Sequence, residues 1–156
     1  MIRLDVEWSP AKPGKLFRSA NLSFLRVDLT ADQNGFATIV EHIEKAVKTG
    51  SADILVDGES AQLQLSIRIG SDAFGTGMLC CAAWRDGVIL LGDSSALGEI
   101  AAAAQSFADR LKAGQSFVGD HIHIELWTPG PNDRLGELTL YADLFPGDSA
   151  GAAPEP

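Results

Sequence analysis

The sequence has little positive charge, only two cysteines and no long apolar run, and each of these shortages excludes a class of protein. Its 156 residues include 12 lysines and arginines against 21 aspartates and glutamates, which gives a net charge of −9. Binding to a phosphate backbone needs clustered basic residues, so we expect no nucleic-acid partner. No apolar run approaches the roughly 18–20 residues of a membrane-spanning helix, so we expect no membrane partner either.

The two cysteines, Cys80 and Cys81, are adjacent in the sequence. Neighbouring residues on a strand point to opposite faces, so a disulfide between them would need a strained ring, and we expect reduced thiols. The N-terminus alternates apolar and charged residues, whereas a signal peptide has a basic stretch followed by an unbroken apolar run. These features predict a cytoplasmic protein.

Motifs that carry chemistry are scarce. The glycine-rich segment from Gly70 to Gly77 has neither a Walker lysine nor the Gly-x-Gly-x-x-Gly spacing of a dinucleotide-binding loop, so we interpret it as a connector. Asp32 and Asp93 precede helical stretches, and we interpret them as helix caps rather than paired catalytic acids. The sequence therefore predicts no catalytic residues and no cofactor.

The apolar residues, 46% of the chain, follow the periods of strands and helices. Alternation predicts strands over the ranges 2–8, 22–29, 52–56, 61–69, 78–85, 88–91, 120–127 and 137–144. Helical spacing runs from Asp32 to Gly50 and from about Ser94 to Ala113. The dipeptides Asp57-Gly58 and Asp86-Gly87 predict tight hairpin turns.

The order strand–strand–helix–strand–strand occurs twice. A gapless shift of 61 positions pairs Asp32 with Asp93 and Ile39 with Ile100, although any two strand–helix units share some of this pattern. We predict one α+β domain over residues 1–145, made of two ββαββ halves at about 1–70 and 78–145, with a flexible tail at 146–156. The halves are expected to form a largely antiparallel sheet with both helices on one face.

A sheet that is covered by helices on one side leaves its other side open to solvent. Polar residues that alternate with core residues are expected on that open face, which is broader than a small-molecule pocket requires. They are Gln62, Gln64, Arg68, His121, His123, Glu125, Thr139, Tyr141 and Asp143.

The sharpest local feature is the segment Asp120-His121-Ile122-His123-Ile124-Glu125. On a strand, His121, His123 and Glu125 share one face because side chains alternate. Two imidazoles and a carboxylate could hold a zinc or iron ion and leave one coordination position open. A solvated strand face explains the same alternation without a metal, and the third histidine, His42, belongs to the first helix. Both interpretations stay open.

The charge is unevenly distributed along the chain. Residues 1–20 carry four basic and two acidic residues, a net charge of +2, whereas residues 115–156 carry one basic and seven acidic residues, a net charge of −6. Acidity concentrated in the last third would steer a basic partner surface towards that end. The alternative is that an acidic surface only keeps the protein soluble.

Three motifs occur together in the second half of the chain. They are Val88-Ile89-Leu90-Leu91-Gly92-Asp93 with the Leu97/Ile100 helix that follows, then Asp120-His121-Ile122-His123-Ile124-Glu125, then Gly136-Glu137-Leu138-Thr139-Leu140. In this order they resemble a family of small immunity proteins that accompany secreted toxins in bacterial polymorphic toxin systems. The resemblance covers roughly residues 88–144, with 25–69 as a diverged copy, so this chain has two units instead of one. It implies a protein that neutralises a cognate toxin by binding it.

We therefore predict a non-enzymatic, cytoplasmic protein-binding module, an inhibitor that masks the active surface of a toxin whose own surface is basic. The residues predicted to contact the partner are His121, His123, Glu125, Tyr141 and Asp143. The first alternative is a metal-binding protein or enzyme centred on His121, His123 and Glu125. The second alternative is a self-associating structural module, for example a homodimer.

Overall fold

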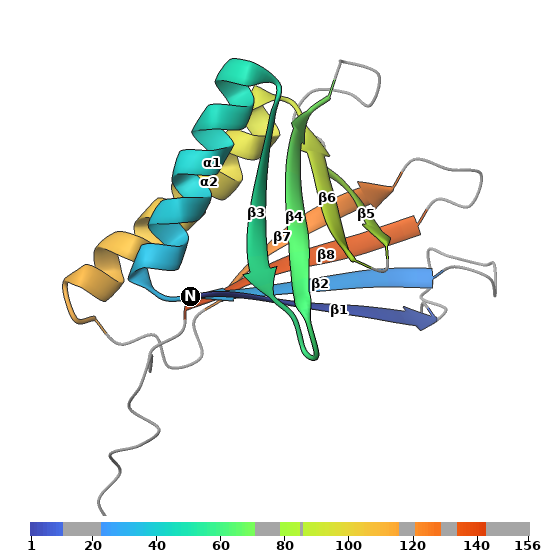
Figure 1. Cartoon of the computed structure of the whole chain (residues 1–156), viewed down its shortest axis with the longest axis horizontal. Helices are drawn as coiled ribbons and strands as arrows, with labels where there is room; N and C mark the ends of the chain where they lie inside the picture. The colour runs from blue at the N-terminus through green and yellow to red at the C-terminus, as the bar shows by residue number, and fades with distance from the viewer. Residues whose placement is uncertain (11–22, 71–78, 85, 116–120, 129–133, 143–156) are drawn as a thin grey trace, which may run out of the picture.

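A computed structural model of the chain describes residues 1–10, 23–70, 79–84, 86–115, 121–128 and 134–142. These residues form eight strands and two helices (Figure 1). In chain order the elements are β1 (Ile2–Pro10), β2 (Ser23–Ala31), α1 (Gln33–Thr49), β3 (Ser51–Asp57), β4 (Gln62–Ile69), β5 (Leu79–Trp84), β6 (Gly87–Gly92), α2 (Ser94–Lys112), β7 (His121–Thr128) and β8 (Arg134–Ala142). The predicted tail at 146–156 lies outside the described residues.

The strands close into a barrel in the order β1-β2-β8-β7-β5-β6-β4-β3. Antiparallel hairpins (β1–β2, β3–β4, β5–β6 and β7–β8) alternate round the barrel with parallel pairs (β1–β3, β2–β8, β4–β6 and β5–β7). The predicted fold, a largely antiparallel sheet of two ββαββ halves, is therefore wrong. The physical reason is that alternation identifies which residues share a face, but it does not identify the neighbouring strand.

Two of the parallel pairs are much shorter than the others. Within the described residues, β1 pairs with β3 at Arg3 and Asp57 alone, and β5 pairs with β7 at Cys80 and Trp127 alone. The barrel therefore consists of two four-stranded sheets, β1-β2-β8-β7 and β5-β6-β4-β3, which meet at two narrow seams. Exchanging β1–β4 with β5–β8 leaves the cyclic order of the strands unchanged.

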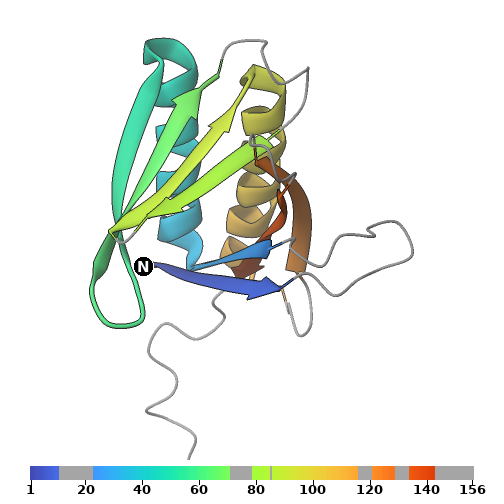
Figure 2. The ribbon, with the colours of Figure 1, turned by 90° about the vertical axis from the view of Figure 1, so that its right-hand side faces the viewer.

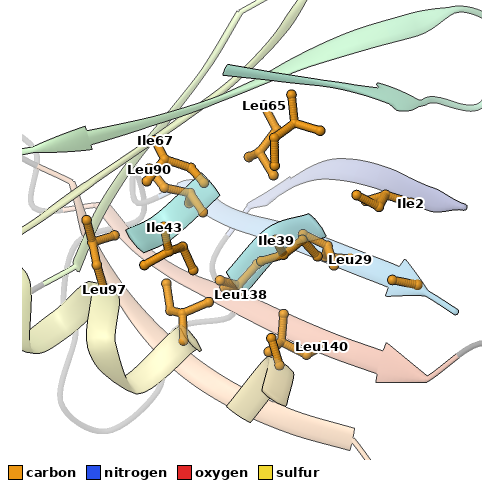
Figure 3. Close-up of a cluster of buried hydrophobic side chains, with 14 of the residues drawn as sticks. Ile2, Leu29, Ile39, Ile43, Leu65, Ile67, Leu90, Leu97, Leu138 and Leu140 are labelled. Carbon is orange, nitrogen blue, oxygen red and sulfur yellow. The ribbon is translucent and has the colours of Figure 1, made fainter. Parts of the chain in front are cut away.

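The two helices lie side by side against the strands (Figures 1 and 2). The rings of Phe36 from α1 and Phe107 from α2 are 5.2 Å apart, and both are buried. Apart from these two rings, the core between helices and strands is mainly aliphatic (Figure 3). Its members include Ile2, Leu29, Ile39, Ile43, Leu65, Ile67, Leu90, Leu97, Leu138 and Leu140. Burial of this apolar surface is what holds the helices to the barrel.

The helix ends agree with the predicted caps. The Asp32 carboxylate accepts a hydrogen bond of 2.7 Å from the Gly35 N–H, and Asp93 accepts one of 2.8 Å from the Ala96 N–H. These bonds satisfy N–H groups that the first turn of a helix leaves without a partner. Gly50 ends α1 with a φ of 95°, the left-handed conformation that glycine adopts without strain.

Two further expectations concern burial and the membrane. Cys81 is a buried thiol, as predicted, whereas the side chain of Cys80 lies outside the description. Neither described helix combines the length and the apolar character needed to cross a bilayer.

Candidate partner-binding face

The outer surface of the sheet β1-β2-β8-β7 is built from three rows of paired positions. The rows are Arg3-Thr30-Tyr141-His121, Asp5-Asp28-Thr139-His123 and Glu7-Arg26-Glu137-Glu125. Residues paired across strands share a face, and in all four strands the alternate residues point into the core. These twelve positions, named the outer polar face below, therefore lie on one side of four neighbouring strands.

The outer polar face carries an excess of negative charge. Five of its residues are acidic, namely Asp5, Glu7, Asp28, Glu125 and Glu137, and two are arginines, which gives a formal charge of −3 with histidines neutral. Charges of one sign that are fixed on a sheet raise the local concentration of a partner of opposite sign.

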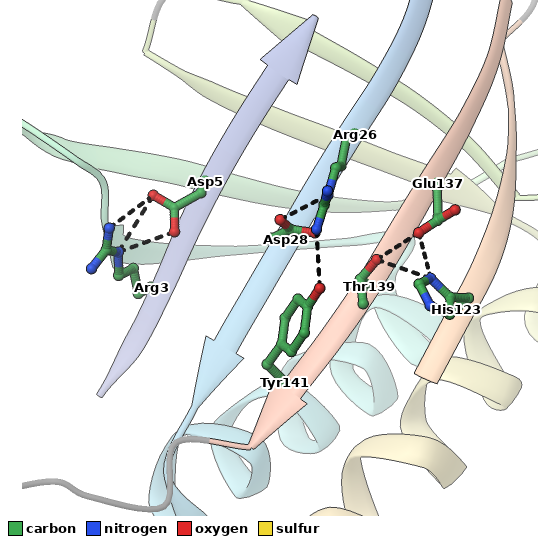
Figure 4. A network of polar contacts seen from close by, with 8 residues as sticks. All are labelled: Arg3, Asp5, Arg26, Asp28, His123, Glu137, Thr139 and Tyr141. Atoms are coloured by element: carbon green, nitrogen blue, oxygen red, sulfur yellow. Dashed lines mark hydrogen bonds and ion pairs between the residues drawn. The ribbon is translucent and has the colours of Figure 1, made fainter. Parts of the chain in front are cut away.

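Arg26 links two strands of this face (Figure 4). Its Nε lies 2.9 Å from the Asp28 carboxylate on β2, and its NH2 group donates a 3.0 Å hydrogen bond to the Tyr141 hydroxyl on β8. The hydrogen bond and ion pair with Asp28, and then the bond to Tyr141, raise the pKa of Arg26 above its ordinary value. The guanidinium is thus held in one place on the surface by partners from two strands.

A second network joins β7 and β8. The His123 Nδ1 contacts the Glu137 carboxylate, and the Thr139 hydroxyl donates a 3.0 Å hydrogen bond to the same carboxylate (Figure 4). The Thr139 hydroxyl also lies 3.3 Å from the His123 Nδ1. Thr139 is fully buried although it belongs to an outer row of the face. The network fixes the orientation of an exposed imidazole and a partly exposed carboxylate.

Aromatic rings lie at one end of the face. The His121 ring lies 5.6 Å from the Tyr141 ring and 4.4 Å from the His123 ring, in the second case edge to face. Tyr141 is partly exposed, so part of its side chain is available to a partner. Amphipathic aromatic rings of this kind are frequent anchors in protein interfaces.

The structure brings three of the five predicted contact residues together: His121, His123 and Tyr141. Glu125 lies on β7 opposite Glu137, but its side chain is outside the description. Asp143 lies outside the described residues altogether.

Other polar residues that the sequence placed on the same open surface lie elsewhere. Gln62, Gln64 and Arg68 are on β4, in the second four-stranded sheet, so they are not part of the outer polar face. Conversely, sequence reasoning missed Arg26 and Asp28. Their alternation with Val27 and Leu29 predicted that they face solvent on their own strand. Nothing in the sequence predicted that this strand, β2, pairs with β8.

The structure does not test the predicted metal site, because the side chain of Glu125, one of its three ligands, lies outside the description. In the described part of the chain, no group of three His, Cys, Asp or Glu side chains is arranged to hold a metal ion. His123 instead contacts Glu137, a carboxylate from the neighbouring strand. The sequence also contains Gly147-Asp148-Ser149-Ala150-Gly151, which has the Gly-x-Ser-x-Gly spacing of a nucleophile elbow, but this segment is outside the description.

Comparison with known proteins assigns the chain to no family. No protein-family model matches it, and no curated protein shows significant sequence similarity to it. Among solved structures, the crystal structure of Drosophila Suppressor of Fused is similar, with a TM-score of 0.35 and 13% sequence identity. The match covers 74% of this chain and 24% of that chain, so this chain spans about a quarter of its length. A likeness at this level carries no argument about fold or activity.

Proposed function

We propose that the chain is a non-catalytic, cytoplasmic protein-binding module, and that its outer polar face contacts a basic surface of a protein partner. We further propose that it acts as an immunity protein that masks the active surface of a cognate toxin. The finer role depends on the resemblance of residues 88–144, and the binding role depends on the geometry of the face.

The observation that carries the proposal is the ordering of charged and aromatic groups across four paired strands. Arg26 is tied to Asp28 and Tyr141, and His123 is tied to Glu137. Side chains that are already held in place lose less conformational entropy when a partner binds. A face of this kind presents a fixed pattern of charge, which gives specificity and a fast association rate.

Within this pattern, Tyr141 and Arg26 are the expected anchors of the interface. Tyrosine and arginine are enriched among residues whose truncation costs the most binding energy, especially near the centre of an interface. Arg26 and Tyr141 touch each other across the two middle strands of the face, β2 and β8, whereas Arg3 and Asp5 form an exposed pair on its edge strand β1. We expect the edge pair to influence the association rate more than the affinity.

Affinity capture followed by calorimetry tests this proposal. The wild-type chain is used to capture proteins from cells of the source organism, and the captured protein is purified and titrated. We expect Arg26→Ala and Tyr141→Ala each to weaken its binding by at least about 30-fold, which corresponds to about 2 kcal/mol. If the partner is a toxin, co-expression of the wild-type chain restores growth and co-expression of these variants does not.

Two variants on α2 serve as matched controls. Glu99→Ala and Gln105→Ala change exposed residues of α2, away from the outer polar face, and should leave the affinity unchanged. Circular dichroism confirms that each variant is folded. Equal binding by the wild type and the Arg26 and Tyr141 variants would refute the proposed face.

A metal-binding role is the second candidate, because the His121 and His123 rings are neighbours on an exposed strand. With a carboxylate from Glu125 they would supply three ligands of the kind that zinc and iron accept. Elemental analysis of protein purified without chelators distinguishes the metal-binding role from the protein-binding role. The binding-module proposal predicts less than about 0.1 zinc or iron per chain, whereas a resident metal site gives a stoichiometric amount.

A further inference from the structure

The seam between β1 and β3 opens into a groove. The two strands pair at Arg3 and Asp57 alone, because β3 ends there and the chain turns back into β4. Beyond that point one edge of β1 faces the ends of β4, β5 and β6 across a cavity of about 790 Å³, which both inner and outer residues of β1 line. This volume lies within the range of about 300–1,000 Å³ that is common for ligand pockets.

The groove is lined by apolar residues and by five charged residues, four acidic and one basic. Val6, Leu63 and Ala83 line it with partly buried apolar side chains. Glu7 on β1 and Glu59 in the β3–β4 turn also line it, and both residues are exposed. Arg3, Leu4, Asp5 and Asp28 complete the lining, and the six residues Val6, Glu7, Glu59, Leu63, Ala83 and Gly87 are named the seam groove below.

The two glutamates differ from the other carboxylates beside the groove. Asp5 is paired with Arg3 at 3.1 Å, and the Asp28 carboxylate is paired with an arginine of its own strand. In the part of the chain that the structure describes, neither Glu7 nor Glu59 forms an ion pair with another residue. Arg3 also lines the groove, where it pairs with Asp5, so among the described residues Glu7 and Glu59 are the lining carboxylates without an ion-pair partner.

A ligand that contacts both the apolar residues and the carboxylates of the groove needs an apolar stem and a cationic head. An arginine side chain meets this requirement, since its methylene groups can lie against Val6, Leu63 and Ala83 while its guanidinium reaches a carboxylate. The planar guanidinium has five N–H donors, so it can bind two carboxylates from different directions. Lysine offers a compact ammonium that is more strongly hydrated, and it fits this arrangement less well.

We propose that the seam groove receives an arginine side chain from an exposed loop of the protein partner. The inference rests on the proposed function, because Glu7 belongs both to the groove and to the outer polar face. A partner bound to that face would reach the groove across β1. This proposal adds one feature to the predicted partner: its basic surface includes an arginine that projects beyond the surrounding residues.

Titration of the ¹⁵N-labelled full chain with short peptides tests the groove directly. The probe is acetyl-Ala-Arg-Ala-amide, and the matched controls contain citrulline, which has the same shape without charge, or lysine. We expect amide shifts at Val6, Leu63, Ala83 and Gly87, with a dissociation constant of the order of 1 mM for a single anchor. Citrulline should bind at least about tenfold more weakly than arginine, and lysine should lie between them.

Variants separate the groove from general attraction to an acidic protein. Glu7→Gln combined with Glu59→Gln should weaken the arginine peptide at least about tenfold, whereas Glu99→Gln on α2 removes an exposed charge and should have no effect. Shifts spread over the whole surface, equal binding of citrulline, or an unchanged affinity of the double variant would each overturn the proposal. The titration needs no partner, so its failure leaves the outer polar face to be tested by partner capture.

Discussion

Ser66→Ala removes one buried hydroxyl from the sheet β5-β6-β4-β3. Its effect on stability should depend on pH, which tests the hydrogen bond between Ser66 and Asp53. Ser66 on β4 is 2% exposed, and its hydroxyl donates a 2.7 Å hydrogen bond to the Asp53 carboxylate on β3. It also accepts a 3.0 Å bond from the Gln64 side chain. A hydrogen bond to a charged acceptor contributes about 1.5–3 kcal/mol to stability. Because Asp53 is partly solvated, water can replace the lost donor, and we expect the free energy of unfolding to fall by about 1 kcal/mol at pH 7.

The loss should depend on pH because Asp53 titrates. The hydrogen bond from Ser66 lowers the pKa of Asp53 most strongly, burial opposes the shift, and Arg68 at 2.8 Å and Gln64 lower it further. A carboxyl whose folded pKa is lowered stabilises the fold above its unfolded pKa of about 3.9, and this stability disappears as the pH falls through the folded pKa. The cost of Ser66→Ala should therefore be full above about pH 5 and shrink towards pH 3.

Urea unfolding followed by circular dichroism at several pH values between about 3 and 7 measures this difference. The control is the same substitution in an Asp53→Asn background, where no carboxyl titrates at that position and the cost should be the same at every pH. A cost in the wild-type background that does not change with pH would refute the assigned role of the Ser66 hydroxyl.

Three further substitutions test packing elsewhere. Thr139→Val keeps the shape of a fully buried residue but removes the donor to Glu137, and it should cost about 1 kcal/mol in urea unfolding; no loss would contradict the network. Gly35→Ala places a Cβ 2.2 Å from the Met1 carbonyl oxygen and should cost about 1–3 kcal/mol. At Gly98→Ala the new Cβ meets no atom within 4 Å, so the substitution should raise the free energy of unfolding by about 0.5–1 kcal/mol. Equal melting temperatures for Gly35→Ala and Gly98→Ala would refute the difference in packing between the two positions.

The individual elements could be predicted from the sequence because their signals are local. The aspartate caps and the glycine after the first helix are each contained within a few neighbouring residues, and the structure contains them. The hairpin expected at Asp57-Gly58 is also present, but residues 58–61 connect its strands in place of a tight two-residue turn, and Asp57 is the last residue of β3. Alternation in the last strands likewise placed His121, His123 and Tyr141 on one face. Each of these inferences needs no knowledge of residues distant in the chain.

The arrangement of the strands could not be predicted in this way. The contact between Arg26 and Tyr141 joins residues that are 115 positions apart, and it exists because β2 lies parallel to β8. A period of two is the same for parallel and antiparallel neighbours, so the pattern did not distinguish the mixed barrel from the expected antiparallel sheet. The same ambiguity hid Arg26 and Asp28 from the predicted site.

The seam groove was equally inaccessible to sequence reasoning. Glu7, Leu63 and Ala83 belong to three separate strands, and each is unremarkable in its own segment. They meet because β3 ends at Asp57 and, in the described part of the chain, leaves an edge of β1 without a neighbouring strand beyond Arg3. Predicting the groove would have required both the strand order and the length of each strand.

Hydrogen–deuterium exchange of the chain, free and bound to the partner identified by capture, tests the central claim most directly. If the outer polar face is the binding surface, protection on binding should concentrate in β1, β2, β7 and β8, and the exposed sides of α1 and α2 should exchange as in the free protein. Protection over the helices, with those four strands unchanged, would contradict it.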